Sequence, residues 1–249
     1  MRAVKKLFDK IMSLVFVPKC VGCGARLSHD DILCPKCFGE YMFDKNTKCP
    51  SCNGKMSDCT CAPEVMRDMG LSRYIKLLPY KHGEHETTER MLYELKRHRN
   101  KKLIDFFATE IALPISKYMK SKPANYVITY CPRTPKEKLK YGFDQSKSVA
   151  RECARILSVP FEVTVYNDGK KLQKEASHSE RVKNAKNSYY VYDDADFSGK
   201  TYFLLDDVVT TASTMRTCKN LLKDMGAKDV IAVSLYQAIR FHRFKSTAL

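Results

Sequence analysis

One stretch, from Thr201 to Met215, most constrains the fold of this chain. It begins as a short apolar run with aromatic and branched residues, a pattern typical of a buried strand in a parallel sheet. Two adjacent carboxylates, Asp206 and Asp207, end this run, and a loop rich in hydroxyl groups follows. Apolar residues then recur at helical spacing until Gly226 stops the helix. The stretch therefore predicts a strand, an acidic pair, a loop and a helix of an α/β fold.

The loop after the acidic pair predicts a phosphate site. A loop that enters a helix at the carboxyl end of a strand offers free backbone N–H groups and the positive end of the helix dipole. This loop also carries hydroxyl donors at Thr210, Thr211, Ser213 and Thr214. Carboxylates, in contrast, bind hydroxyl groups or Mg²⁺. A ligand that needs both is a sugar phosphate, so we expect its 5′-phosphate in the loop and its ribose hydroxyls on the acidic pair. An ordinary capped turn would explain one such residue, not all of them together.

This stretch resembles the fingerprint of the type I phosphoribosyltransferases, in which two acidic and two apolar residues precede Thr-Thr-Gly-x-Thr. The ligand of that family is phosphoribosyl pyrophosphate (PRPP) with Mg²⁺, and the resemblance implies that Asp206 and Asp207 are catalytic. It implies a PRPP-binding loop made of Thr210, Thr211, Ala212, Ser213 and Thr214. Ala212 stands where the family has Gly. Because an alanine methyl group costs about 1–2 kcal/mol at positive φ, we expect weaker PRPP binding than with Gly.

Length and charge agree with one α/β domain and a small second module. The chain has 249 residues, and 44 lysine and arginine residues against 28 aspartate and glutamate residues give a net charge of +16. Most of the excess lies after residue 70, on the same side of the chain as the expected phosphate site. It fits a polyanionic ligand such as PRPP and fits a nucleic acid equally well. No apolar run reaches the roughly 18 residues needed to span a membrane.

Cysteine pairs near the N-terminus predict two metal sites. Eight of the eleven cysteines lie between residues 20 and 61, in three CxxC pairs and one CxC pair. Such clustering without a secretory signal indicates metal in a reducing cytosol, so we expect a cytoplasmic protein without disulfides. Zn²⁺ takes four thiolates in a tetrahedron, and one or two structural ions are expected in a double zinc ribbon. The first site would use Cys20, Cys23, Cys34 and Cys37, and the second Cys49, Cys52, Cys59 and Cys61.

The order of these features predicts two units. Residues 1–65 would form an amphipathic helix and the zinc ribbon, and residues 70–249 an α/β domain with a parallel sheet and flanking helices, joined by a linker over residues 62–70. The expected strands cover residues 73–80, 126–131, 201–205 and 230–236, and helical patterns cover residues 88–114 and 146–157. The basic run at residues 96–102 is either a solvated helix face or a nucleic-acid patch.

A second basic segment follows the strand that ends at Cys131. Arg133 and Lys136 come soon after that carboxyl end, where a pyrophosphate needs cations, so we expect both to bind PRPP. Residues 166–188 are polar and charged, and would form a loop or hood that closes over the ligand. Within this segment, Arg181 is the residue expected to reach PRPP.

Three features together resemble the family of competence protein ComF. The first is the block Tyr141-Gly-Phe-Asp-Gln145, which matches Arg-Gly-Phe-Asn-Gln in that family. The second is the double zinc ribbon. The third is a block with matching spacing at Gln173, Ser177, Ser179, Arg181, Asn184 and Tyr189. Tyr141 and Asp144 replace the Arg and Asn of the first block, which removes a cation from the loop and adds an anion.

The resemblance to ComF implies a role in DNA uptake during natural transformation, with single-stranded DNA and DNA-uptake proteins as partners. Two functions of different class follow. The chain is either an enzyme that transfers phosphoribose from PRPP to an acceptor, or a non-catalytic protein that handles single-stranded DNA on a phosphoribosyltransferase fold. A third and weaker alternative is a nucleobase salvage enzyme, because such enzymes do not usually carry a zinc ribbon.

Overall fold

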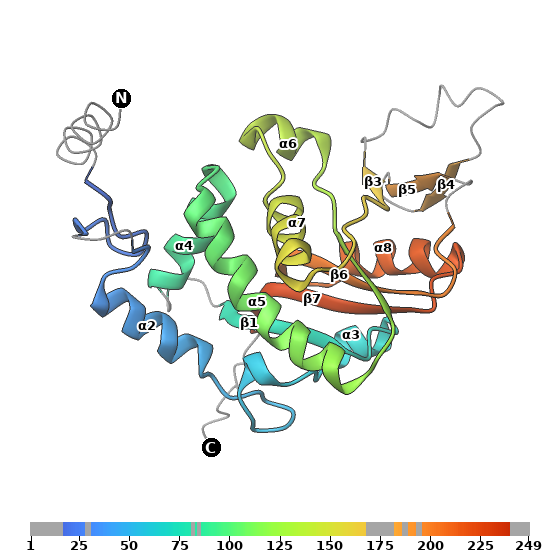
Figure 1. Ribbon diagram of the computed structural model, residues 1–249, viewed down its shortest axis with the longest axis horizontal. Helices are drawn as coiled ribbons and strands as arrows, with labels where there is room; N and C mark the ends of the chain where they lie inside the picture. Colours follow the sequence, from blue (N-terminus) through green and yellow to red (C-terminus); the bar gives the residue numbers. More distant parts are fainter. Residues whose placement is uncertain are drawn as a thin grey trace, which may run out of the picture.

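A four-stranded parallel sheet is the centre of the protein, seen here in a computed structural model (Figure 1). The structure describes residues 17–27, 31–80, 83, 86–167, 182–185, 189–192 and 196–239. The strands lie in the order β1-β7-β6-β2, and their bounds are β1 (Tyr74–Tyr80), β2 (Asn125–Tyr130), β6 (Lys200–Val209) and β7 (Asp229–Ala238). The four expected strands are therefore confirmed, and with them the α/β fold with a parallel sheet.

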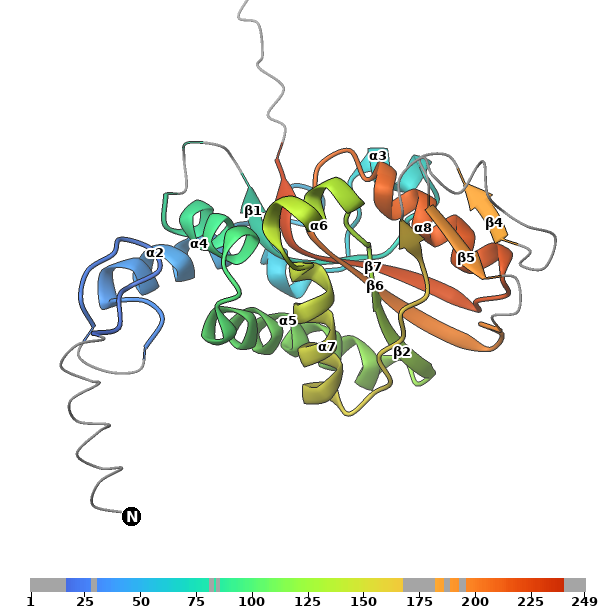
Figure 2. The same ribbon diagram turned by 90° about the horizontal axis from the view of Figure 1, so that it is seen from above.

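Helices cover both faces of this sheet (Figure 2). The first layer consists of α4 (Glu86–Arg97), α5 (Lys101–Ser121) and α7 (Gln145–Leu157), and the second of α3 (Glu64–Asp68) and α8 (Ser213–Asp224). Alternate residues of β6 enter the two apolar cores: Phe203 and Leu205 the first, Leu204 the second. Because both faces are buried, the strands appear in the sequence as nearly continuous apolar runs.

The other elements surround this centre. They are α2 (Pro35–Lys45), the 3₁₀ turn η1 (Met56–Asp58), α6 (Pro135–Tyr141), and a small antiparallel sheet of β3 (Tyr166–Asn167), β5 (Tyr189–Tyr192) and β4 (Val182–Ala185). The small sheet occupies part of the segment expected to form a loop or hood. Arg181 and the expected amphipathic helix, apart from Val17, lie outside the described residues.

Two expected boundaries were wrong. The helical pattern over residues 88–114 is two helices, since α4 ends at Arg97 and α5 begins at Lys101. Asn100 caps α5 by accepting a hydrogen bond from the N–H of Leu103 at 3.2 Å. The strand expected to end at the acidic pair continues to Val209, because β7 is long enough to pair with it there.

The segment expected to be a linker is part of the second core. Ala62, Met66 and Leu71 are each 1% exposed and pack against the sheet and α8, with Met66 carried by α3. The cysteine module is tied in as well, because Tyr41 of α2 belongs to the first core and its hydroxyl donates to Glu110 of α5. The two units expected from the sequence therefore share their apolar cores.

Candidate functional site

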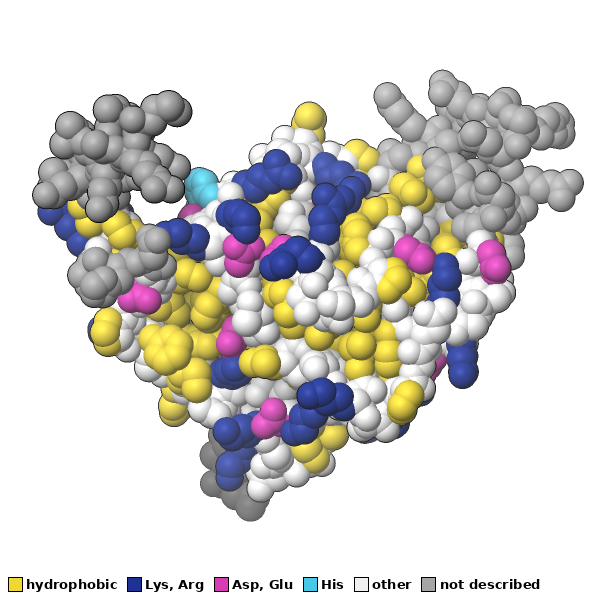
Figure 3. Space-filling view, viewed as in Figure 1, with side chains coloured by type: hydrophobic (Ala, Val, Ile, Leu, Met, Phe, Trp, Pro, Cys, Tyr) yellow, Lys and Arg dark blue, Asp and Glu magenta, His cyan; other side chains and the backbone are white. Residues whose placement is uncertain are grey.

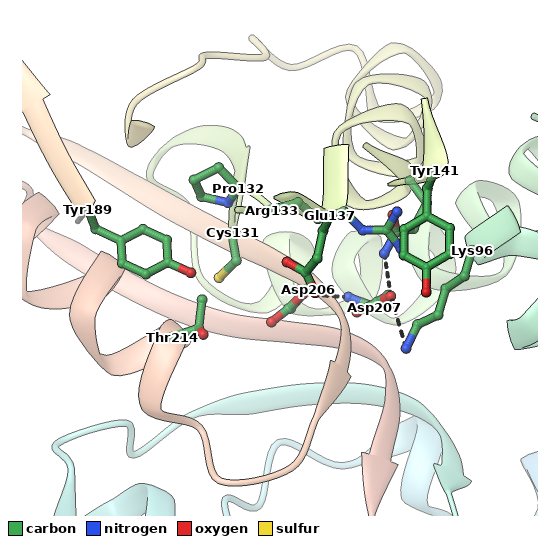
Figure 4. Close-up of a pocket in the computed structure, with 11 residues that line it drawn as sticks. Lys96, Cys131, Pro132, Arg133, Glu137, Tyr141, Tyr189, Asp206, Asp207 and Thr214 are labelled. Carbon is green, nitrogen blue, oxygen red and sulfur yellow. Dashed lines mark hydrogen bonds and ion pairs between the residues drawn. The ribbon is translucent and has the colours of Figure 1, made fainter. Parts of the chain in front are cut away.

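The carboxyl ends of β2 and β6 and the amino end of α8 surround an open pocket of about 200 Å³ (Figure 4). Its charged lining residues are Lys96, Arg133, Glu137, Asp206 and Asp207, and the others are Cys131, Pro132, Tyr141, Gln145, Tyr189 and Thr214. The pocket thus brings together the acidic pair, Arg133 and one hydroxyl of the loop. Lys136, on α6, is exposed and does not line the pocket.

The acidic pair is held by its own backbone. Asp206 Oδ1 accepts a hydrogen bond from the N–H of Asp207 at 2.9 Å, and Asp207 Oδ1 accepts one from the N–H of Val208 at 2.7 Å. Burial, with the nearby Asp207 carboxylate second, raises the pKa of Asp206 well above its usual value. The ionised pair is therefore costly in the free protein and favours a ligand that brings a cation or hydroxyl donors.

Two side chains from other elements reach Asp207 (Figure 4). Lys96, in the last turn of α4, places Nζ 3.6 Å from Asp207 Oδ2. Gln145, the first residue of α7, donates from Nε2 to the same oxygen. Its Oε1 is buried and has no hydrogen-bond partner among the described residues. A buried acceptor of this kind costs free energy until a donor meets it, so the pocket suits a ligand with hydroxyl groups or bound water.

The hydroxyl loop has the backbone that its family resemblance implies. Ala212 has φ 58° and ψ 10°, the left-handed region that Gly favours. Its methyl group faces the second core, where the residue is 5% exposed, and does not line the pocket. The first N–H groups of a helix have no partners within the helix, and no side chain caps those of α8. Of the loop hydroxyls only Thr214 lines the pocket, while Thr211 and Ser213 are exposed and 3.1 Å apart.

The segment from Tyr141 to Asp144 holds Arg133 in place. Its guanidinium lies 4.6 Å from the centre of the Tyr141 ring and donates to the carbonyl of Phe143 at 3.4 Å. Asp144 accepts a hydrogen bond from the N–H of Arg133 at 3.0 Å and also caps α7. The Tyr141 ring and the Asp144 carboxylate therefore hold Arg133 at the pocket.

Several pocket residues were missed by sequence reasoning. Glu137 forms a capping box with Thr134 at the start of α6, and the pattern Thr-x-x-Glu was visible in the sequence. Tyr189 shares a hydrogen bond with Thr214, and burial raises the pKa of its hydroxyl. Lys96 was expected only as part of a surface run, because its reach to Asp207 depends on how α4 packs.

The rest of the basic run is partly engaged in local contacts. The Arg97 guanidinium lies 4.1 Å from the centre of the Tyr93 ring, and Lys101 Nζ is 2.6 Å from Asp105 Oδ2. Elsewhere, lysine and arginine side chains gather over α6 on the face seen in Figure 3, beside the pocket. The cations that line the pocket thus come from α4 and from the loop after β2, while the lysines of α6 lie outside its lining.

The eight N-terminal cysteines form two clusters of four, Cys20, Cys23, Cys34 and Cys37, and Cys49, Cys52, Cys59 and Cys61. In each cluster the sulfur atoms all lie within 4.8 Å of one another. Cys23 Sγ lies 3.7 Å from Cys34 Sγ. A tetrahedron with Zn–S bonds of about 2.3 Å requires about 3.8 Å between sulfurs. Both clusters therefore fit a tetrahedral metal ion, in the grouping that the sequence predicts.

Comparison with known proteins adds a family match to this geometry. The family model described as the phosphoribosyl transferase domain matches residues 145–244. This part of the chain is therefore similar to the phosphoribosyltransferases. The match runs from Gln145 through the acidic pair and the hydroxyl loop to beyond β7. None of the curated proteins compared with the chain matches it.

Solved structures of related fold are similar to about half of the chain. Adenine phosphoribosyltransferase of Saccharomyces cerevisiae is 15% identical, with a TM-score of 0.39 over 56% of this chain and 70% of its own. The adenine enzyme of Thermoanaerobacter pseudethanolicus is 12% identical, with a TM-score of 0.36 over 56% and 82%. Phosphoribosylpyrophosphate synthetase of Mycobacterium smegmatis is 21% identical, with a TM-score of 0.32 over 52% of this chain and only 33% of its own. At these values no residue role is transferred from them.

No helix in the part of the chain that the structure describes is long and apolar enough to cross a membrane.

Proposed function

We propose that the pocket binds PRPP with Mg²⁺ and that the protein is a phosphoribosyltransferase. One observation carries the proposal: the acidic pair of β6, the uncapped amino end of α8 and the cations Arg133 and Lys96 meet around one pocket. Negative and positive groups side by side suit a ligand with hydroxyls at its centre and phosphates at both ends. The family match over residues 145–244 supports the same ligand class.

Each part of PRPP has a place in this arrangement. The ribose hydroxyls would donate to Asp206 and Asp207. The 5′-phosphate would accept hydrogen bonds from the first N–H groups of α8, with Thr210, Thr211, Ser213 and Thr214 as further donors and Ala212 shaping the turn. The pyrophosphate would face Arg133 and Lys96. Lys136, exposed on α6, and Arg181, outside the described residues, would join it only after the surrounding segments close over the ligand.

The donor set at the acidic pair fits Mg²⁺. This ion prefers oxygen ligands and keeps several waters, and the pocket offers two carboxylates and the unpartnered Oε1 of Gln145. Bound with PRPP, the ion would supply positive charge to the leaving pyrophosphate. The raised pKa of Asp206 agrees with a carboxylate that ionises readily only beside a cation.

In the proposed reaction the bond from ribose C1 to the pyrophosphate oxygen breaks, and pyrophosphate leaves with the electron pair. A lone pair of the acceptor forms the new bond to C1, and the acceptor's proton passes to water. Positive charge that develops on the ribose is stabilised by Asp206 and Asp207. Negative charge on the leaving group is stabilised by Arg133 and Lys96. The protein thus contributes orientation and preorganised charge.

We also propose Zn²⁺ in both cysteine clusters and a role in DNA uptake. Zinc is supported by the four-sulfur geometry of each cluster, and the cytoplasm by the need for reduced thiolates. DNA uptake rests on the resemblance to ComF in the blocks around Tyr141–Gln145 and Tyr189 and in the double ribbon. Single-stranded DNA would be a partner whose acidic backbone meets the cations gathered over α6.

Calorimetry tests the PRPP site. Asp206→Asn with Asp207→Asn should abolish PRPP binding with Mg²⁺ but leave inorganic phosphate binding nearly unchanged. Thr214→Val should weaken phosphate and PRPP together, by the roughly 1.5–3 kcal/mol of a hydrogen bond to a charged group. Wild-type protein that binds phosphate but not PRPP with Mg²⁺ would overturn the proposal in favour of a non-catalytic DNA-handling protein.

A further inference from the structure

A lysine lies buried against the second cysteine cluster. Lys76, in the middle of β1, is 1% exposed. Its Nζ donates to Cys59 Sγ at 2.9 Å, to the carbonyl of Cys61 at 2.7 Å and to the carbonyl of Cys59 at 3.4 Å. The three N–H bonds of the ammonium are therefore all directed at residues of this cluster. The Tyr74 ring also lies nearby, with its centre 5.6 Å from Nζ.

A buried ammonium requires negative charge nearby. Among the described residues no carboxylate oxygen lies within 4.0 Å of Lys76 Nζ. Lysine side chains are almost never fully buried without a partner, and here the partner is a cysteine sulfur. Four thiolates around one Zn²⁺ carry a net charge of about −2, so a metal-loaded cluster supplies the missing anion. A loaded metal centre would therefore explain why a lysine can be buried here, and the lysine would offset part of the charge of the centre.

The first cluster differs in this respect within the part of the chain that the structure describes. Cys20 Sγ accepts from the N–H of Cys34 at 3.3 Å, and the cation beside this cluster, Arg90, is exposed and donates to the carbonyl of Gly22 at 3.0 Å, not to a sulfur. Among the described residues the two clusters therefore have the same four ligand types, but only the second is faced by a buried ammonium. The first cluster is an internal control for what Lys76 does.

We propose that Lys76 is a positioning residue of the second metal centre, donating to the Cys59 thiolate and offsetting part of the charge of the metal–thiolate group. The inference rests on the zinc proposed above and goes beyond the PRPP site. Outer contacts of this kind orient the ligand atoms and raise metal affinity, and their loss typically costs about 10–100-fold in affinity.

The same contact attaches the metal centre to the central sheet. Cys61 forms a bridge with Arg73, and the N–H of Tyr74 donates to the carbonyl of Thr60 at 3.0 Å. Lys76 is in register with Ser234 of β7, which is in register with Asp206 of β6. These three residues, in register on neighbouring strands, therefore connect the second cluster to the acidic pair. The second cluster is attached to β1, the edge strand of the same sheet whose other strands carry the pocket.

Metal competition on the full chain tests this role. Wild type, Lys76→Met and the control Lys200→Met are loaded with Zn²⁺ or Co²⁺ and titrated with a chromophoric chelator. Lys200 is half-buried and its Nζ donates to Glu162 at 2.9 Å, so its loss removes a strand lysine that has a polar partner without touching a cysteine. Lys76→Met should lose affinity at one of its two metals by about 10–100-fold, with the other unchanged.

The Co²⁺ spectrum supplies a readout that a merely structural role would not move. An N–H donor lowers the energy of the sulfur electrons, so losing it should shift the part of the sulfur-to-cobalt charge-transfer absorption that comes from Cys59 to longer wavelength. Unchanged affinity and spectrum in folded Lys76→Met would overturn the inference. If that variant does not fold, Lys76→Gln keeps donors for the two carbonyls without charge and is judged by the same two outcomes. Wild type without bound metal would overturn the zinc proposal itself.

Discussion

Lys96 Nζ lies 3.6 Å from Asp207 Oδ2, so a lysine from a surface run of charges belongs to the pocket. The contact joins the last turn of α4 to the carboxyl end of β6, two elements far apart in the sequence. The basic run at residues 96–102 is therefore not one uniform solvated face or nucleic-acid patch. The first lysine of the run faces the acidic pair, whereas Lys101 pairs with Asp105 on the exposed side of α5.

Replacing Lys96 should therefore weaken ligand binding more than replacing Lys101. Lys96→Met removes a cation at the proposed pyrophosphate position, and we expect PRPP affinity with Mg²⁺ to fall about 10-fold or more, as for other hydrogen bonds to charged groups. Lys101→Met, an exposed lysine of the same run, should change it by less than about twofold. Calorimetry at two salt concentrations measures both. Equal losses in the two variants, with a steep salt dependence, would instead indicate a diffuse nucleic-acid patch.

The left-handed Ala212 should affect stability rather than affinity. Its strained backbone is already present in the free protein, so PRPP binding does not have to create it. Ala212→Gly relieves about 1 kcal/mol of strain but loses a buried methyl group worth about 0.8 kcal/mol, so we expect little change in urea unfolding. Ala212→Val should destabilise by about 2 kcal/mol or more, because a branched side chain is worse at positive φ. A Gly variant with greatly tightened PRPP binding would contradict this account.

Asp206→Asn should stabilise the free protein near neutral pH. Burial and Asp207 raise the pKa of Asp206, so the folded state holds its proton more tightly than the unfolded state. Stability is then lost as pH rises from the unfolded pKa towards the folded one, and Asn, which is never ionised, avoids that loss. We expect Tm at pH 8 to rise by about 2–4 °C, which corresponds to about 1 kcal/mol for a chain of this size, and less at pH 5.5. A lower Tm at pH 8 would show that the carboxylate is stabilised by the fold.

Metal removal should destabilise the whole chain. Two separate units, as expected from the sequence, would leave the C-terminal part largely intact when the ribbon is lost. The shared cores change this expectation, because Tyr41 packs with the helices on the sheet and Met66 packs with α8. A strong chelator should lower the Tm of a single cooperative transition, followed by tyrosine fluorescence and far-UV circular dichroism together. A second transition unmoved by the chelator would restore the view of two independent units.

The parts of this fold that depend on local pattern could be predicted from the sequence. The four strands and the cysteine grouping follow from neighbouring residues, and the left-handed backbone at position 212 agrees with the Gly that the resemblance to the phosphoribosyltransferases places there. The contacts that could not be predicted join distant segments: Lys96 with Asp207, and Lys76 with Cys59. Both lysines looked like ordinary members of charged or strand patterns. Their roles arise only once α4 and β1 are packed, which no local pattern contains.

The first strand of the sheet, β1, pairs with the last one in the sequence, β7, with Tyr74 in register with Ala232. Synthesis proceeds from the N-terminus, so all eight cluster cysteines emerge from the ribosome long before β7 exists. During that interval β1 is an unpaired strand, the kind of segment that aggregates. Zinc captured by the second cluster would hold Cys59 and Cys61 against this strand while it waits. The supply of zinc during translation, and not only in the finished protein, would then determine how much of the chain folds.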